Sequence, residues 1–170
     1  DIELRGNLEF NTDLLRFDYS SPITPRTTYS YNMNSQSLEI LHRKSAGNFD
    51  PSQYTSERIS FPADDGTMIP VSLFHKKGLV RDGKAPMHLY GYGAYGSTHD
   101  NYFNPAKISL VDRGITCAIA HIRGGGDLGR KWYESGRLMN KKNTFSDFIN
   151  CAEYMLKQGY TSKDRLIAQG

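Results

Sequence analysis

ITCAIA, residues 115–120, is an almost continuous apolar run that decides the fold class. Its β-branched and small apolar residues favour a strand, and the lack of regular polar alternation indicates that both faces of the strand are buried. Strands of this kind occur in parallel sheets that are covered by helices. The run therefore predicts an α/β domain.

Strands and helices alternate on both sides of this run. Residues 87–90 (MHLY) predict a strand, residues 106–111 predict a short helix that stops at Gly114, and residues 165–168 (RLIA) predict a further strand. From residue 87 onward the expected order is βαβαβ, which is typical of an α/β architecture with a mostly parallel sheet.

The clearest helix of the chain precedes the last of these strands. We expect Thr144 to cap its start, Asp147 to lie in its first turn and Gly159 to end it. The residues expected on its core-facing side recur at helical spacing, and they are Phe145, Phe148, Ile149, Ala152, Met155 and Leu156.

The first part of the chain has a different pattern. Residues 1–46 predict short antiparallel strands separated by turns, enough for about one blade of a propeller or one sheet of a sandwich. Residues 47–57 are polar and aperiodic, so they are the expected linker to a second domain at 58–170. That domain opens with a hairpin, because Asp65-Gly66 lies between two β-rich runs and tolerates the positive φ of a tight turn.

Composition excludes several classes of protein. The 170 residues include 21 Lys and Arg against 18 Asp and Glu, a formal charge of only +3, with the two signs interspersed. This pattern does not indicate a nucleic-acid binder. No run approaches the roughly 18 apolar residues of a membrane helix, so no membrane partner is expected. The start has neither Met nor a signal peptide, and we expect the chain to be a piece of a longer protein.

Cysteine and histidine patterns do not predict a metal site. Cys117 and Cys151 have no CxxC spacing and are expected to be reduced and buried. The five histidines form no HxH or HxxxH pair, so a metal site would need ligands from distant elements. The basic residues after the second glycine loop are expected to form a solvated or domain-facing surface: Arg123, Arg130, Lys131, Arg137, Lys141 and Lys142.

Two glycine loops allow other interpretations. Gly91, Gly93 and Gly96 satisfy G-x-G-x-x-G after a strand, which is the NAD(P)-binding pattern only where a helix opens, and the polar residues that follow do not predict one. The run 124–126 (GGG) lacks the Lys-Ser/Thr of a phosphate-binding loop and predicts a tight turn. Ser97, His99 and Asp100 are too close in sequence to form a catalytic relay, and a solvated loop is expected.

Five motifs taken together are specific. They are LYGYGAYG at 89–96, DRG at 112–114, HIRGGGDLG at 121–129, WY at 132–133 and KNTFSDF at 142–148. With them the chain resembles the prolyl oligopeptidase family (S9) of serine peptidases, most closely its oligopeptidase B (protease II) branch. The resemblance implies the last strands of a β-propeller followed by the N-terminal half of an α/β-hydrolase domain. It also implies cytoplasmic cleavage of short peptides after Arg or Lys by Ser-His-Asp acyl transfer.

The resemblance assigns three positions. Tyr92 occupies the place of the phenol that contributes to the oxyanion hole, and a phenol is a neutral donor at pH 7. Without the resemblance, Tyr92 would be one of 11 tyrosines that pack a loop. Asp100 is expected either to face a basic substrate residue or to cap its own loop. The resemblance implies a second acid two positions further on, where this chain has Tyr102. Gly170 would begin the G-x-S-x-G nucleophile elbow.

The nucleophile itself is missing from the sequence. No G-x-S-x-G occurs in residues 1–170, so the serine and the triad Asp and His are expected downstream. The chain alone is expected to be inactive, to need no cofactor or metal, and to be unstable or to self-associate through uncovered sheet edges. Two alternatives remain open: an NAD(P)-binding oxidoreductase domain and a non-catalytic, propeller-linked binding module.

Overall fold

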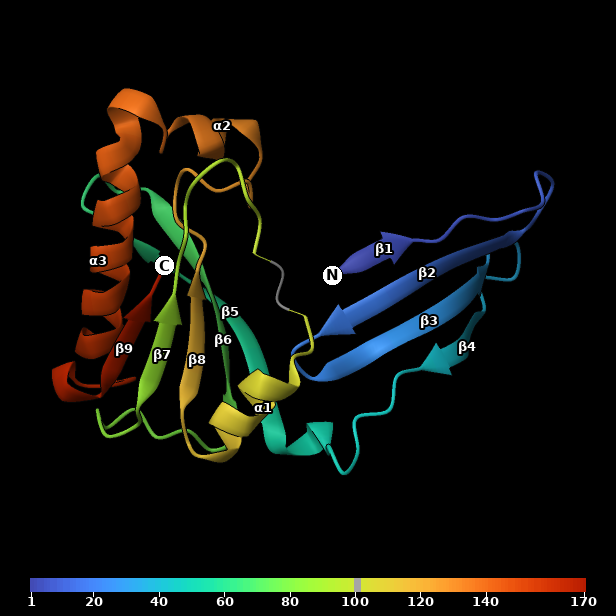
Figure 1. The fold of residues 1–170 in the computed structure, drawn as a ribbon, viewed down its shortest axis with the longest axis horizontal. Helices are drawn as coiled ribbons and strands as arrows, with labels where there is room; N and C mark the ends of the chain where they lie inside the picture. The colour runs from blue at the N-terminus through green and yellow to red at the C-terminus, as the bar shows by residue number, and fades with distance from the viewer. Residues whose placement is uncertain (100–101) are drawn as a thin grey trace. The chain divides into compact units, whose positions relative to one another are not determined.

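A computed structural model describes residues 1–99 and 102–170, and these residues form two compact units (Figure 1). The first unit contains Asp1–Ser52 with residues 102–105, and the second contains Gln53–His99 with Ala106–Gly170. Each unit holds one β-sheet, and the sheet of the second unit carries the helices.

The first unit is built on a four-stranded antiparallel sheet. Its strands follow chain order across the sheet: β1 (Ile2–Leu4), β2 (Leu14–Ser21), β3 (Thr24–Asn32) and β4 (Leu38–Arg43). The short antiparallel strands expected within residues 1–46 are confirmed, since neighbouring strands pair antiparallel throughout this sheet. The β2–β3 pair is held by a stack of Phe17 on Tyr29, with ring centroids 5.4 Å apart.

A buried carboxylate ties the first three strands together. Asp18 on β2 is 3% exposed and accepts hydrogen bonds from Arg5 at 2.7 Å, Arg26 at 2.8 Å and Thr28 at 2.6 Å. The hydrogen bond from Arg5 contributes most, and with Thr28 and Arg26 it lowers the pKa of Asp18 far below its ordinary value although burial opposes this. Asp18 is therefore a charged residue that stabilises the unit only while it is ionised.

This arrangement predicts a pH-dependent stability. At pH 7 we expect Asp18→Asn to lower the free energy of unfolding by roughly 1–3 kcal/mol, because hydrogen bonds to a charged group are lost. Since the pKa is depressed in the folded state, the advantage of Asp18 is complete above its unfolded-state pKa of about 4 and is lost as the pH falls toward the folded value. Thermal unfolding of both proteins between pH 7 and pH 2 measures this difference.

Asp13→Asn is the matched control, because Asp13 is exposed on the same unit. Its melting temperature should follow that of the unmodified protein at every pH. A constant gap between the unmodified protein and Asp18→Asn from pH 7 to pH 2 would contradict the assigned role.

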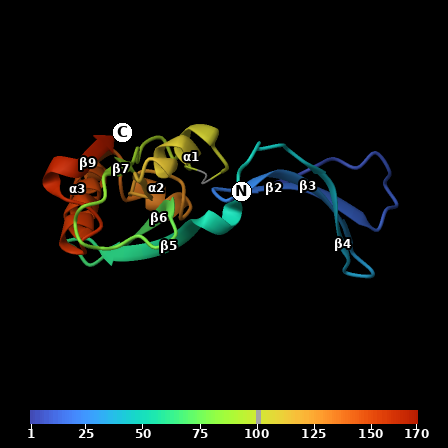
Figure 2. The ribbon, with the colours of Figure 1, turned by 90° about the horizontal axis from the view of Figure 1, so that it is seen from below.

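The second unit has a mixed five-stranded sheet with the order β5-β6-β8-β7-β9 (Figure 1), and Figure 2 shows the same unit from below. Its strands are β5 (Tyr54–Pro62), β6 (Met68–Lys76), β7 (Met87–Tyr90), β8 (Thr116–Ala120) and β9 (Leu166–Gln169). β6 pairs antiparallel with β5 and β8, whereas β7 pairs parallel with both β8 and β9. The predicted α/β class is confirmed; among the strands of the described residues, parallel pairing joins β8, β7 and β9.

The predicted hairpin and buried strand are also confirmed. The β5–β6 turn closes with a bond from the Ala63 N–H to the Thr67 carbonyl at 2.9 Å, and Gly66 has the positive φ of 80° that the turn requires. Every residue of β8 is buried, as the run at 115–120 predicts. This strand lies inside the sheet, where both faces are covered.

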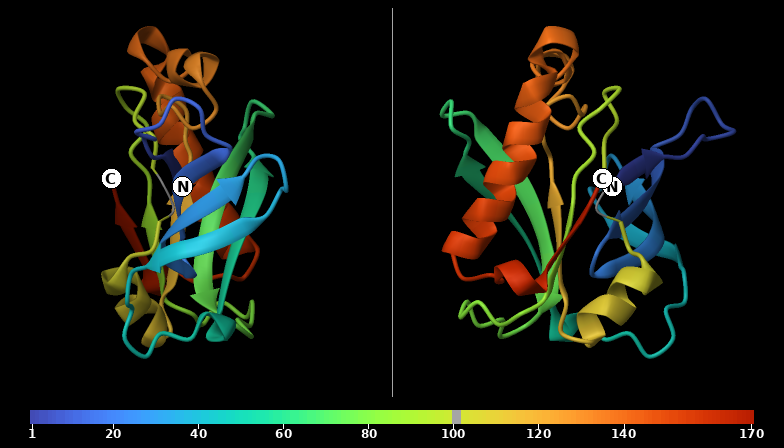
Figure 3. Two further views of the ribbon diagram at one scale, coloured as in Figure 1. Left: turned by 90° about the vertical axis from the view of Figure 1, so that its right-hand side faces the viewer. Right: turned by 60° about the vertical axis from the view of Figure 1, so that its left-hand side comes forward.

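Helices complete the second unit. α1 (Pro105–Asp112) precedes β8, the short α2 (Arg130–Glu134) follows it, and α3 (Lys141–Lys157) runs alongside the strands (Figure 3). Single 3-10 turns occupy Pro51–Gln53, Leu138–Asn140 and Lys163–Arg165. The core lies between α3 and the sheet, where Cys151 and Met155 meet Leu73, Met87 and Leu89. Within the described residues, no helix is both long and apolar enough to span a bilayer.

The start and the buried face of α3 differ from the prediction. The helix begins at Lys141, so Thr144 is an interior residue and not a cap, and Asp147 is fully buried beyond the first turn. Phe145 and Ile149, expected in the core, are 62% and 57% exposed. The buried positions are Thr144, Asp147, Cys151 and Met155. Apolar periodicity misses the first two because they are buried against loop backbone, where polar side chains find hydrogen-bond partners.

Candidate active site

Two glycine-rich loops meet beyond the carboxyl ends of β7 and β8. Residues 91–99 follow β7 and residues 121–129 follow β8, and the strands are parallel neighbours. The loops are joined by backbone hydrogen bonds from the Gly96 N–H to the Gly124 carbonyl at 3.0 Å and from the Gly126 N–H to the Ser97 carbonyl at 2.9 Å. In open α/β sheets, ligands bind at the carboxyl ends of the strands, so the paired loops are a candidate binding site.

The two loops approach so closely that glycine is required. Gly93 has a φ of 58°, and a Cβ there would lie 2.5 Å from the Thr144 side chain and 2.6 Å from that of Ile122. Any larger residue would separate the first loop from the second loop and from α3. The glycines therefore fix the path of the backbone on either side of Tyr92.

Tyr92 lies at the exposed bend of the first loop. Its side chain is 40% exposed, and its ring contacts the rings of Tyr95 and His99, with centroids 6.5 and 5.8 Å away. The Gly93 carbonyl next to it accepts a hydrogen bond from Lys141 Nζ of α3 at 2.7 Å. A phenol held on a braced backbone and open to solvent is suited to donate a hydrogen bond to a bound substrate.

The end of β9 lies beside this bend. The Gly91 N–H donates to the Gln169 carbonyl at 3.0 Å, and a Cβ on Gly170 would come within 2.5 Å of the Gly91 carbonyl oxygen. Tyr92 and Gly170, assigned to one site from sequence, are thus brought together by β7 and β9. Asp100, the third assigned position, lies outside the described residues.

The alternative readings of the first loop find no structural support. The first helix after the loop in the described chain is α1, which begins only at Pro105, so Gly91, Gly93 and Gly96 have no adjoining helix N-terminus for a pyrophosphate. The expected tight turn at 124–126 is confirmed by a bond from the Gly125 N–H to the Ile122 carbonyl at 3.3 Å. Ser97 accepts the Gly126 N–H with its carbonyl, and the His99 ring contacts the Tyr92 ring.

Sequence reasoning missed a buried Ser–His–Asp relay. His121 Nδ1 lies 2.7 Å from Asp127 Oδ1, and its Nε2 lies 2.8 Å from Ser72 Oγ. Ser72 and His121 are 6% and 4% exposed, so no substrate carbonyl can reach this serine. The spacing of His121 and Asp127 around the glycine turn was the only signal in the sequence, since Ser72 comes from a distant strand.

A second buried network was also missed. Arg123 was expected on a basic surface, but it is 6% exposed and forms a two-bond pair with the fully buried Asp147, with contacts of 2.8 and 2.6 Å. It also pairs with Asp65, and this hydrogen bond lowers the pKa of Asp65 to about 2. The surface prediction is therefore wrong for Arg123, because its charge is neutralised inside the unit. Three of the other basic residues are exposed: Arg130, Lys131 and Lys142.

The cysteines behave as predicted. Cys117 and Cys151 are buried free thiols, and burial raises the pKa of Cys151 to about 12. Neither thiol is poised to act as a nucleophile. Across residues 1–99 and 102–170, no cluster of three His, Cys, Asp or Glu side chains has the arrangement of a metal site.

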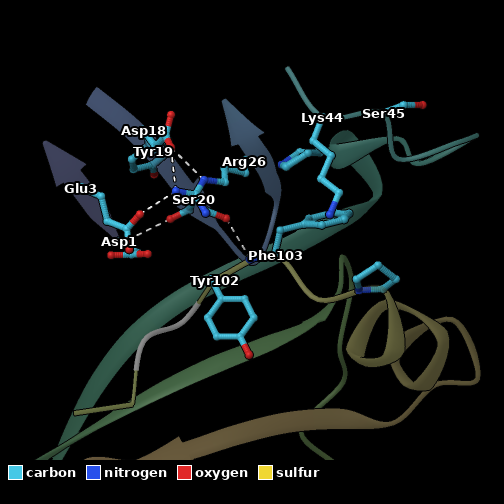
Figure 4. Close-up of a pocket in the computed structure, with 12 residues that line it drawn as sticks. Asp1, Glu3, Asp18, Tyr19, Ser20, Arg26, Lys44, Ser45, Tyr102 and Phe103 are labelled. Atoms are coloured by element: carbon cyan, nitrogen blue, oxygen red, sulfur yellow. Dashed lines mark hydrogen bonds and ion pairs between the residues drawn. The ribbon is translucent and has the colours of Figure 1, made fainter. Parts of the chain in front are cut away.

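The first unit has a hollow of about 460 Å³, shown in Figure 4. Arg26, Lys44, Tyr102 and Phe103 are among its lining residues. The guanidinium of Arg26 is shared between Glu3 and Asp18, at 2.6 and 2.7 Å, so its charge is already matched within the wall. The hollow offers no nucleophile paired with a base, and the Tyr92 loops remain the stronger candidate.

The chain is similar to several known peptidases. Residues 101–170 match the model of the prolyl oligopeptidase family. The chain is 48% identical to dipeptidyl aminopeptidase BI of Pseudoxanthomonas mexicana over 98% of its length and 36% identical to protease 2 of Moraxella lacunata over 99%. Oligopeptidase B from Trypanosoma brucei, solved with covalently bound antipain, superposes with a TM-score of 0.87 at 37% identity over 98% of the chain.

The chain spans about a quarter of each of these proteins. It corresponds to 23% of dipeptidyl aminopeptidase BI, 25% of protease 2 and 24% of the Trypanosoma brucei chain. The predicted resemblance to the prolyl oligopeptidase family is confirmed over the matched region. Most of each relative's length lies outside that region.

Proposed function

We propose that this chain, a homologue of the prolyl oligopeptidase family, is a segment of a longer serine peptidase that cleaves short peptides after Arg or Lys. In this proposal residues 1–46 are the last strands of a β-propeller and residues 47–57 are a linker. Residues 58–170 are the first half of an α/β-hydrolase domain. The similarity to protease 2 and to oligopeptidase B supports the preference for basic residues.

One observation carries the proposal: Tyr92, which is 40% exposed, directly follows Gly91, whose N–H is bonded to the end of the parallel strand β9. In α/β-hydrolases the nucleophilic serine stands on a sharp turn directly after a strand, and donors from a neighbouring loop face the oxygen of the attacked carbonyl. Gly170 would open that turn after β9. The serine, the triad Asp and His, and a second oxyanion donor would follow in the longer chain.

The chemistry assigned to this segment is oxyanion stabilisation. Attack by the serine on a peptide carbonyl places negative charge on the carbonyl oxygen, and the Tyr92 hydroxyl donates a hydrogen bond to that oxygen. The phenol remains protonated during the reaction and needs no cofactor. Asp100 is proposed to attract the basic side chain of the substrate.

The proposed setting follows from the same residues. The partners are short peptides with basic residues. A cytoplasmic location fits the free thiols of Cys117 and Cys151, because disulfides are rare there.

The test is hydrolysis by the longer protein that contains this chain. We expect kcat/KM for arginyl and lysyl 4-nitroanilide peptides to be at least about tenfold higher than for the prolyl equivalent. This ratio corresponds to a free-energy preference of more than about 1.4 kcal/mol for the contact between opposite charges. Faster cleavage after proline would overturn the proposed specificity. Hydrolysis of none of the three would overturn the proposed function.

Residues 1–170 alone are the matched negative control. This polypeptide contains Tyr92 but no G-x-S-x-G, so we expect no hydrolysis and association through the uncovered strand edges. Release of nitroaniline by this polypeptide would contradict the assignment of the nucleophile to a downstream position.

A further inference from the structure

The relay of Ser72, His121 and Asp127 has the order of a catalytic triad but cannot act as one. Ser72 belongs to β6 inside the sheet, and all three side chains are at most 9% exposed. An ionised Asp127 selects the tautomer of His121 that carries a proton on Nδ1. Nε2 then accepts a hydrogen bond from the Ser72 hydroxyl. The relay fixes the direction of the Asp127 carboxylate relative to the sheet.

Burial alone would favour a neutral Asp127. Burial raises the pKa of this carboxyl, but the hydrogen bonds from His121 and from the His99 N–H outweigh it and lower the pKa below its ordinary value. Asp127 is therefore a buried carboxylate whose charged form is stabilised by its hydrogen-bond donors.

Asp127 also holds the loop that carries Tyr92. The oxygen that meets His121, Asp127 Oδ1, accepts the backbone N–H of His99 at 3.4 Å. The His99 ring packs edge-on against Tyr90 and Tyr92, with centroids 4.9 and 5.8 Å away and interplanar angles of 84° and 87°. A continuous path of contacts thus runs from the sheet through Asp127 and His99 to the Tyr92 ring.

We infer that Asp127 is a positioning residue for the Tyr92 phenol. It anchors the His99 backbone, and the His99 ring sets the direction of Tyr92. This inference rests on the proposed function, because it gives Asp127 a role through the proposed oxyanion donor. An oxyanion donor is effective only when it is held at the place where charge develops, and small displacements are costly.

The test is a double-mutant cycle in the longer protein. We expect Asp127→Ala to lower kcat about tenfold, because the donor is misplaced, with KM within about twofold. In the Tyr92→Phe background the same change should lower kcat by less than about twofold, since the donor it positions is already absent. Asp127→Asn keeps an oxygen where Oδ1 lies, and it should recover kcat to within about threefold of the unmodified enzyme.

A general loss of structure gives a different pattern. If Asp127 only stabilised the fold, Asp127→Ala would reduce kcat by the same factor in both backgrounds, and the inference would be overturned. An unchanged kcat in Asp127→Ala would overturn it as well. Asp82→Ala is the matched control, because this aspartate lies in a turn and pairs with Lys84 at 3.1 Å, and it should leave kcat unchanged.

Failure of the proposed function has its own signature. If Tyr92→Phe itself leaves kcat unchanged, the oxyanion role fails and the inference fails with it. If Tyr92→Phe lowers kcat, but Asp127→Ala lowers it further by the same factor in the Tyr92→Phe background as in the unmodified enzyme, only the inference fails. Should Asp127→Ala not fold, His99→Ala takes its place in the cycle under the same criteria, since it removes the ring contact and leaves the backbone N–H.

Discussion

Replacing Tyr92 by Phe in the longer protein is expected to lower kcat by a factor of about 100 to 1,000, with KM nearly unchanged, the cost of one lost oxyanion donor. The substitution removes a single hydroxyl and keeps the ring that contacts Tyr95 and His99. The bend itself is held by backbone bonds and close glycine packing, so it should survive the change. Steady-state kinetics on an arginyl 4-nitroanilide peptide measures both constants.

Tyr95→Phe is the matched control for this prediction. Tyr95 lies in the same loop and is 85% exposed, but the proposal gives its hydroxyl no role. Its kcat should stay within about twofold of the unmodified enzyme, as for an ordinary surface change. Equal losses in the two variants, or turnover unaffected by Tyr92→Phe, would remove Tyr92 from the mechanism.

Breaking the buried pair of Arg123 and Asp147 should have the largest effect on stability. Asp147 is fully buried, and Arg123 supplies two side-chain hydrogen bonds and one backbone N–H to its carboxylate. Arg123→Met leaves that carboxylate without its charge partner, and we expect a loss of about 3–5 kcal/mol in the free energy of unfolding. Urea unfolding followed by circular dichroism measures the loss.

The double variant Arg123→Met/Asp147→Leu distinguishes the loss of the charge pair from a general loss of structure. Replacing both charges with apolar side chains removes the uncompensated carboxylate, so part of the stability should return. Arg130→Met is the surface control, since Arg130 pairs with Glu134 on an exposed helix face, and it should change stability by less than about 1 kcal/mol. A small effect of Arg123→Met would show that Asp147 is satisfied without its cation.

Local signals in the sequence were enough for most of the strand residues of the second unit, although residues 54–57, expected in the linker, already belong to β5. The apolar run at 115–120 and the Asp65-Gly66 turn each specify their structure within a few residues. The α3 helix shows where such reasoning fails. Phe145 and Ile149 have apolar side chains at helical spacing, but the buried face carries Thr144 and Asp147, whose partners lie in loops.

Long sequence separation hid the rest of the site. Ser72 and His121 are 49 residues apart, and Arg123 and Asp65 are 58 apart. Spacing within one segment cannot indicate such contacts, because they depend on which strands become neighbours. Tyr92 was assigned to the site only because its surrounding motif resembles a known family; composition and periodicity alone favoured a packing role.

The bond from the Gly91 N–H to the Gln169 carbonyl has a consequence for biosynthesis. A ribosome releases the Tyr92 bend well before the strand that carries Gln169, and domains acquire structure as the chain emerges. Until that strand docks, one support of the bend is absent. The Tyr92 bend should therefore become fixed only after β9 has docked against β7.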